Sequence, residues 1–415
     1  MKQCAHKILA LAAMTLLLSG SSFAQNYIRK AQYQKTNYAL AREILSYKQW
    51  IVYNDNPGYF TFGRLDTSGV NNTFWKTQQL IHVRDMENIN NDVYFCGSMF
   101  DSASMSNVGV MGYFSASATT PTIRYIIYDE FETLRKLDFY KVYTTQHVVM
   151  VGTGKDGIDY LVDANRETNT SGICYYGTHT WNQAWTYIPN LDAKFDDIAY
   201  LGDSIVVSAR VSDSSVVYLY TMQASDISCM PFFSAGGIKT KQLIGTYPKG
   251  RVLLQRSNDD TVYVVYRYSN RLAICQFKNS TNIVSKYISY SWVSQSTYTL
   301  KDVAIDRSKQ NLSVLIETFT LLGGTISNSI YHIPTAQVAT GGSVNVHIYG
   351  SSSVYRPVSL SRSVQNMSVS VGSYEGEWGI AKVKNTAPTG NCTTLSTAVL
   401  NNMSKTTALP QTKNR

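Results

Sequence analysis

The sequence has 415 residues, of which only 16% are charged, and its formal net charge is +9. Tyrosine is unusually frequent, with 30 Tyr against 14 Phe and 6 Trp. The hydrophobic content of 44% is too high for a chain that is disordered over most of its length. Beyond the N-terminus, no apolar run approaches the ~20 residues that a membrane-spanning helix needs. These features exclude a disordered chain and a polytopic membrane protein, and the length favours two domains or a repeat architecture.

Residues 1–24 have the pattern of a secretory signal peptide. Lys2 and Lys7 precede an apolar run at 8–18, and small residues occupy the outer positions of the cleavage motif at 22–24. Residues 18–20 resemble the start of a bacterial lipoprotein box, but Ser21 stands where a lipidated Cys is required. We therefore expect an exported protein, periplasmic or secreted, with no lipid anchor and no membrane span.

Cleavage of this leader would remove two lysines and lower the formal net charge from +9 to +7. The remaining basic residues are spread thinly and form no run, so we expect no nucleic-acid partner. We also expect a monomer. Cys96 and Cys275 lie within β-branched and aromatic runs, which predicts that both are buried as small hydrophobic residues.

A short β-rich run recurs at intervals of about 43 to 57 residues. The runs lie at 50–53, 93–97, 148–152, 205–209, 262–266, 312–316 and 367–372. A further candidate strand precedes each of four runs, and another follows every run after a turn rich in Gly, Asn, Asp and Ser. Three or four antiparallel strands in each unit of about 50 residues are typical of a β-propeller.

The sequence thus predicts an all-β protein, a β-propeller of seven blades over residues 25–386. Tandem β-sandwiches are the alternative, but they would need units of about 90–100 residues. We expect the N-terminal segment 27–40 to supply the outermost strand of the last blade. Residues 387–415, rich in Thr, Asn and Ser, are expected to form a disordered tail.

Three features point to a known group of proteins: the leader, the unit pattern, and runs such as VYFCG at 93–97 followed by GVMGYF at 109–114. They resemble uncharacterised exported β-propeller proteins of Gram-negative gut bacteria. The resemblance covers most of residues 40–386, and it implies the fold and the export but no catalytic residues.

Four acidic residues are the most regular polar feature of the repeat. Asp85, Asp138, Asp197 and Asp302 open the first candidate strand of four units. Equivalent positions in a propeller form a ring, so we expect these side chains near one mouth of the central channel. There they could bind a cation such as calcium, or a basic or hydroxyl-rich ligand. The structural alternative is that each carboxylate accepts backbone N–H groups. No other cofactor is implied.

Aromatic residues crowd the two spacers at 175–187 and 287–298. Trp181 and Trp292 are the members that we expect to be exposed. Aromatic faces stack on the C–H faces of sugar rings, which makes these two side chains candidate glycan contacts. The alternative is that the aromatic residues pack between blades, as their β-propensity predicts.

Catalytic signatures are weak. No Gly-x-Ser-x-Gly motif is present, and the histidines do not have metal-ligand spacing. We therefore expect a non-catalytic binding or adhesion module that holds a glycan or a protein on one face. A glycan-active hydrolase or lyase that uses the channel-mouth carboxylates is the alternative, because one fold can host both functions.

Overall fold

The structure is a computed structural model, which describes residues 27–391 with internal gaps, the longest at 167–193 and 223–237, together with residues 411–414. The expected signal peptide at 1–24 lies outside these residues. Strands make up nearly all of the described chain, and α3 (Thr335–Thr340) is a short helix. Within this part of the chain, no helix is both long and apolar enough to cross a membrane.

The described strands form seven small sheets, each built on three or four consecutive antiparallel strands. The first two sheets contain β2 (Tyr38–Ile44), β3 (Lys48–Asn54), β4 (Phe60–Leu65) and β5 (Thr73–Lys76), then β6 (Ile81–Ile89), β7 (Asp92–Asp101), β8 (Ser106–Ser115) and β9 (Ile123–Tyr128). The third and fourth contain β10 (Phe131–Val142), β11 (Thr145–Gly154) and β12 (Asp159–Arg166), then β13 (Lys194–Leu201), β14 (Ser204–Arg210), β15 (Ser214–Met222) and β16 (Ile238–Pro248).

The remaining three sheets follow the same order. The fifth contains β17 (Leu253–Asn258), β18 (Thr261–Tyr268), β19 (Arg271–Lys278) and β20 (Asn282–Ile288). The sixth contains β21 (Ser296–Ile305), β22 (Asn311–Thr320), β23 (Thr325–Pro334) and β24 (Asn345–Tyr349). The seventh contains β25 (Tyr355–Ser363), β26 (Met367–Tyr374), β27 (Glu377–Lys384) and the N-terminal strand β1 (Tyr27–Lys35).

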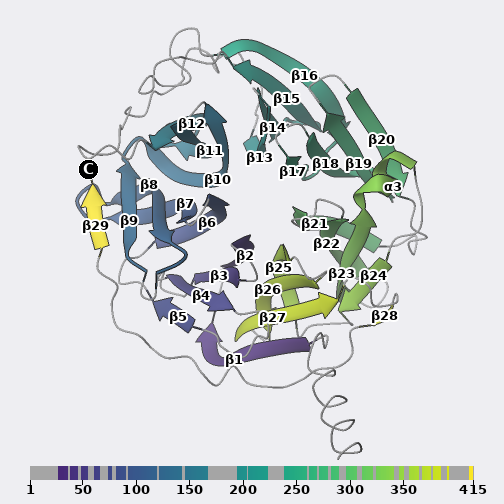
Figure 1. The fold of residues 1–415 in the computed structure, drawn as a ribbon, viewed down its shortest axis with the longest axis horizontal. Coiled ribbons are helices and arrows are strands. Elements are labelled where there is room, and N and C mark those ends of the chain that lie inside the picture. Colours follow the sequence, from purple (N-terminus) through teal and green to yellow (C-terminus); the bar gives the residue numbers. More distant parts are fainter. Residues whose placement is uncertain are drawn as a thin grey trace, which may run out of the picture.

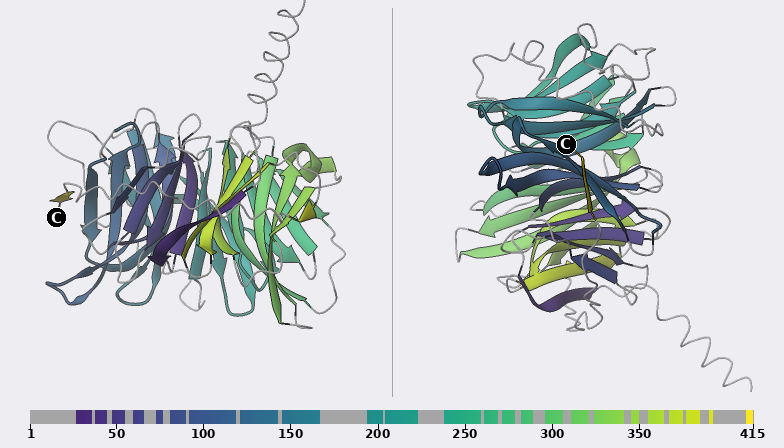
Figure 2. Two further views of the ribbon diagram at one scale, coloured as in Figure 1. Left: turned by 90° about the horizontal axis from the view of Figure 1, so that it is seen from below. Right: turned by 90° about the vertical axis from the view of Figure 1, so that its left-hand side faces the viewer.

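The seven sheets stand around a common axis, with the first strand of each nearest the centre (Figure 1). These inner strands contact one another in a closed cycle that runs through β2, β6, β10, β13, β17, β21 and β25 and returns to β2. Seen from the side, the strands cross the thickness of the ring (Figure 2). The chain is a β-propeller, as the repeat predicts.

The N-terminal strand completes the last sheet of the ring. β1 pairs antiparallel with β27, from Tyr27 opposite Lys382 to Ala31 opposite Trp378. The prediction that the N-terminal segment supplies this outermost strand is confirmed. The pairing joins the two ends of the propeller and covers a sheet edge that would otherwise be exposed.

Two short segments of the expected disordered tail are paired strands instead. β28 (Gly390–Asn391) lies parallel to β24, and β29 (Gln411–Asn414) lies parallel to β9. The physical reason is that β24 and β9 are the outer strands of their sheets, whose free backbone groups can accept another strand.

The core lies between the sheets. On β11, Val149 and Val151 pack with residues of the fourth sheet, whereas Val148 and Met150 pack with residues of the second. Both faces of this second strand are therefore buried, which explains its continuous apolar run. The seven recurrent runs are the second strands of the seven sheets. Cys96 and Cys275 are buried free thiols, as predicted.

Candidate functional site

A β-bulge at an equivalent place interrupts the first strand in five of the described sheets, whereas the register shift of β17 lies elsewhere, between Arg256 and Asn258. We call the residue immediately after this bulge the post-bulge residue. In chain order the post-bulge residues are Asp85, Lys136, Asp197, Asp302 and Ser359. Three of the four predicted aspartates are thus equivalent. Asp138 is a correction, because it lies two residues beyond the post-bulge Lys136 of β10.

The four aspartates also lie inside their strands and not at the start of them. β6, for instance, begins at Ile81, four residues before Asp85. All four side chains are buried, with residue exposures of 4–6%. The extra residue of each bulge shifts the register locally, and this shift cannot be read from the apolar pattern.

The aspartates connect neighbouring sheets through backbone hydrogen bonds. The donors are N–H groups on the first strand of the next sheet: Leu137 to Asp85 (3.3 Å), Tyr200 to Asp138 (2.7 Å), Leu254 to Asp197 (3.0 Å) and Leu360 to Asp302 (2.9 Å). In three of them the other carboxylate oxygen accepts the N–H of the following residue, namely Phe139, Ile198 or Val303. Each carboxylate therefore satisfies backbone groups on an inner strand edge.

Lys136 stands between two of these carboxylates. Its Nζ lies 3.8 Å from Oδ2 of Asp85 on the preceding sheet and 3.8 Å from Oδ1 of Asp197 on the following one. The lysine side chain is 13% exposed, so the attraction is only weakly screened by solvent. A single cation on the third sheet thus links the second and fourth sheets.

Arg256 plays a similar part for Asp138. Its Nη2 lies 3.2 Å from Oδ1 of Asp138, and its Nη1 donates a hydrogen bond of 2.8 Å to the carbonyl oxygen of Phe139. The guanidinium carbon lies 5.9 Å from the ring centroid of Tyr200, which is a cation–π distance. Arg256 belongs to the fifth sheet and so reaches two sheets back along the ring.

Burial raises the pKa of the Asp138 and Asp197 carboxyls. The nearby Arg256 and Lys136, respectively, oppose that rise, and Asp85 adds a smaller increase to both. A metal ion at this place would compete with these two cations and with the backbone donors. No group of three or more metal-ligating side chains was found in the described part of the chain.

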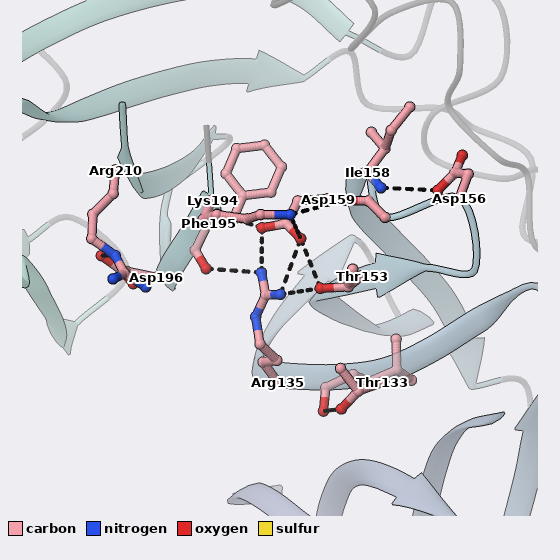
Figure 3. A network of polar contacts seen from close by, with 12 residues as sticks. Thr133, Arg135, Thr153, Asp156, Ile158, Asp159, Lys194, Phe195, Asp196 and Arg210 are labelled. Atoms are coloured by element: carbon pink, nitrogen blue, oxygen red, sulfur yellow. Dashed lines mark hydrogen bonds and ion pairs between the residues drawn. The ribbon is translucent and has the colours of Figure 1, made fainter. Parts of the chain in front are cut away.

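A second network of polar contacts joins the third and fourth sheets around Arg135 and Asp159 (Figure 3). The Arg135 guanidinium contacts both carboxylate oxygens of Asp159, at 3.0 and 2.5 Å, and donates to the carbonyl of Phe195 at 2.9 Å. The same carboxylate accepts the hydroxyl of Thr153 at 2.7 Å and the N–H of Phe195 at 2.7 Å. Every strong acceptor direction of Asp159 is used, which gives this network a structural role.

Hairpins and sheet-to-sheet connections meet on one face of the ring. The N–H of Lys155 donates to the Glu130 carbonyl at 3.0 Å, and Lys194 Nζ donates to the Gly157 carbonyl at 2.8 Å. Each contact joins the hairpin between β11 and β12 to a connection that enters a first strand. We call this side, which carries the hairpins between second and third strands, the hairpin face. The hairpin face could not be predicted from the sequence, because the side on which these hairpins gather follows only from the order of the strands in each sheet.

The predicted aromatic contacts cannot be placed in this geometry, since Trp181 and Trp292 lie outside the described residues. Tyr298, from the same spacer as Trp292, is half-buried at the hairpin face. Its ring centroid lies 5.6 Å from the guanidinium carbon of Arg267, and its carbonyl accepts a hydrogen bond of 3.3 Å from that side chain. Arg267 thereby joins the fifth sheet to the sixth.

No protein-family model matches the sequence, and no curated protein sequence matches it. Similar solved structures include a puromycin hydrolase variant, with 9% identity, 81% of this chain and 50% of that chain covered, and a TM-score of 0.48. The chain thus spans about half the length of that hydrolase. They also include an Aleuria aurantia lectin variant in complex with alpha-methyl-L-fucoside (11% identity, 89% and 99% covered, TM-score 0.37). A third is the phage phi92 endosialidase (8% identity, 87% and 69% covered, TM-score 0.40). None of these similarities is close enough to assign an activity or a ligand to this chain.

Proposed function

We propose that this chain is an exported, non-catalytic binding or adhesion protein that recognises a glycan or a protein on one face of its propeller. The observation that supports this proposal most strongly is the engagement of the inner-strand carboxylates. Asp138 and Asp197 are the residues that a channel-mouth hydrolase or lyase would use, and each is buried and accepts two backbone hydrogen bonds.

An acid or base in glycan cleavage must reach the substrate through hydrogen-bond contact. Asp138 would have to give up Tyr200 N–H and Arg256, and Asp197 would have to give up Leu254 N–H, before either could touch a sugar. Leaving such buried groups without partners costs roughly 1–3 kcal/mol each. A binding function needs no such rearrangement of these carboxylates, so we prefer it to the hypothesis of a glycan-active enzyme.

Within this proposal, Trp181 and Trp292 are candidate glycan contacts, and the leader at 1–24 directs export. A calcium ion at the aspartates is the weaker part of the sequence interpretation, because Lys136 already lies between Asp85 and Asp197.

A glycan array combined with a polysaccharide-digestion screen tests the proposal on residues 25–415. We expect saturable binding with no release of reducing ends or unsaturated products, and weaker glycan binding after Trp181→Ala or Trp292→Ala. The matched variants for catalysis are Asp138→Asn and Asp197→Asn, with the exposed Asp213→Asn as the control. Product release that both buried variants abolish, at unchanged thermal melting and with Asp213→Asn active, would overturn the non-catalytic function.

A further inference from the structure

Six large apolar side chains are exposed among the described residues. Five of the six lie on the hairpin face, at the ends of second strands or in the hairpins that follow: Phe100, Met105, Ile158, Tyr268 and Phe319. The sixth, Leu243, lies on the outer strand β16. Single exposed apolar residues are normal on a surface, so a docking surface needs a second feature beside them.

One of these residues, Met105, has an unusual backbone conformation. Met105 is 74% exposed and has a φ of 50°, in the left-handed region that side chains other than those of Gly, Asn and Asp rarely adopt. A strained, exposed methionine contributes nothing to the core. Met105 lies in the hairpin between β7 and β8, where a positive φ serves the turn.

Cations accumulate on the part of this face that belongs to the fourth and fifth sheets. We call Lys194, Arg210, Lys249, Arg251 and Arg267 the basic arc. Lys194 and Arg210 are cross-strand partners in the β13–β14 register. Lys249 precedes Gly250, whose N–H donates to Ser215 Oγ at 3.3 Å at the start of the third strand of the fourth sheet.

The arc keeps an excess of positive charge after its own carboxylates are counted. Asp196 and Asp213 lie on the same face of this sector among the described residues. Asp159 of the third sheet, whose Oδ1 lies 4.0 Å from Lys194 Nζ, is already paired with Arg135. Asp196 pairs with Arg210 at 2.9 Å and is itself largely buried, so it neutralises one cation of the arc. Asp213 is the one exposed carboxylate described there. A partner that covers the arc must therefore be acidic to match it.

Apolar side chains stand at both ends of the arc. Ile158 is 53% exposed and follows Gly157, whose carbonyl oxygen accepts a hydrogen bond from the Lys194 ammonium group. Tyr268 follows Arg267 directly and is 45% exposed. Aromatic residues and Arg are enriched in protein–protein interfaces. An aliphatic side chain such as Ile158 has no flat face to stack on a sugar ring, which favours a polypeptide over a glycan.

We propose that the basic arc is the docking surface for an acidic segment of a protein partner, whose apolar side chains pack on Ile158 and Tyr268. This inference rests on the proposed binding function and deepens it, because it names the face and the chemical class of the partner. The cations attract and orient the acidic segment, and the apolar ends supply the contacts that exclude water.

The probe for this surface is a random copolymer of Glu and Tyr, with poly-Glu and polygalacturonate as comparison polyanions. Binding of each labelled polymer to residues 25–415 is measured by fluorescence anisotropy. We expect the copolymer to bind more tightly than either comparison. Lys249→Glu together with Arg267→Glu should weaken that binding by about tenfold or more. Lys249→Glu alone, at an exposed position, should weaken it by about threefold.

Two matched control variants test whether binding depends on the basic arc or only on the overall charge and exposed apolar surface of the protein. Lys278→Glu reverses an exposed cation of the same sheet as Arg267, at the opposite end of its strands. Leu243→Ser removes the exposed apolar side chain on the outer strand β16. Neither should change copolymer binding. Tyr268→Ser should weaken binding of the copolymer but leave binding of poly-Glu unchanged.

Unchanged copolymer binding by the folded double variant would overturn the inference, as would the absence of binding to all three polymers. Tighter binding of polygalacturonate than of the copolymer would also overturn it, because the arc would then serve a glycan. None of these results touches the non-catalytic function, which fails separately if the digestion screen shows turnover.

Discussion

The Asp138 carboxylate accepts a hydrogen bond of 2.7 Å from the backbone N–H of Tyr200, across the boundary between two sheets. The donor lies on the inner strand β13, whose edge toward the axis pairs with none of the described strands. Small sheets that stand side by side leave such edges unpaired, and a buried unpaired N–H is costly. A side-chain carboxylate from the preceding sheet solves this problem and fixes how the two sheets meet.

Replacement of this carboxylate should destabilise the propeller. Asp138→Ala leaves Tyr200 N–H and Phe139 N–H without their acceptor and removes the partner of Arg256. We expect the free energy of unfolding to fall by about 3 kcal/mol, measured by chemical denaturation. Asp213→Ala, in an exposed hairpin, is the control and should stay within about 0.5 kcal/mol of wild type. Equal effects of the two variants would contradict the structural role.

The same carboxylate should leave a signature in the pH dependence of stability. Burial raises the pKa of Asp138 in the folded chain above its ordinary value of about 4. Between these two values the folded state binds more protons than the unfolded state, so its stability decreases as the pH rises. The decrease begins near pH 4 and ends above the raised pKa.

Asp138→Asn isolates this contribution, since the amide does not titrate. We expect the stability advantage of wild type over Asp138→Asn to shrink as the pH rises from about 4 toward neutrality, measured by thermal melting at each pH. An advantage that instead grows with pH would mean that the pKa is lowered on folding.

The repeat was predictable because second strands are buried on both faces. A strand such as β11 has no solvent side, so its sequence is a continuous apolar run at 148–152, and seven such runs mark seven sheets. The closure by the N-terminal segment was predictable because this segment precedes the first of the seven units and is free to pair with the last one. The pairing of β29 with β9 was not predictable, because a tail rich in Thr and Asn has no apolar pattern that indicates a strand.

The candidate site was predictable only in part. The four aspartates were recognised as a recurring feature, but their donors lie 52 to 62 residues further along the chain. Lys136 was missed because it occupies the post-bulge position where β6, β13 and β21 have Asp. One local signal existed: Lys136 and Asp138 are two residues apart, which places them on the same face of a strand.

The glycine that ends several second-strand runs has a steric role that can be tested. Gly97 pairs with Val83, the residue before the bulge in β6, and a Cβ at this position would meet the backbone carbonyl oxygen of His82. The carbonyl belongs to a paired strand and cannot move aside easily. Gly97→Ala should therefore cost about 2 kcal/mol of folding stability, measured by chemical denaturation.

Ala209 is the matched control for this glycine. It occupies the corresponding position in β14, opposite Phe195 at the bulge of β13, and already carries a Cβ. Ala209→Gly should cost about 1–2 kcal/mol, from the added backbone freedom of the unfolded chain and the loss of a buried methyl group. If Gly97→Ala proved harmless, the register of the bulge in β6 would have to differ from the one described.

Ring closure by β1 should be separable from the rest of the fold. Deletion of residues 25–35 removes the strand that pairs with β27 and leaves the edge of the last sheet exposed. We expect a lower melting temperature and concentration-dependent self-association, measured by calorimetry and light scattering. A synthetic peptide of residues 25–35 should restore the melting temperature, because an added strand supplies the same backbone hydrogen bonds.

Two controls make this test specific. A peptide of the same composition in scrambled order should not restore melting, since the register from Tyr27 to Ala31 against β27 would be lost. Deletion of residues 411–415 removes β29, which adds only four residues to an outer strand, and should change the melting temperature far less. If both deletions had equal effects, β1 would be an accessory strand like β29, and the contacts of β2 with β25 and β26 would hold the ring closed.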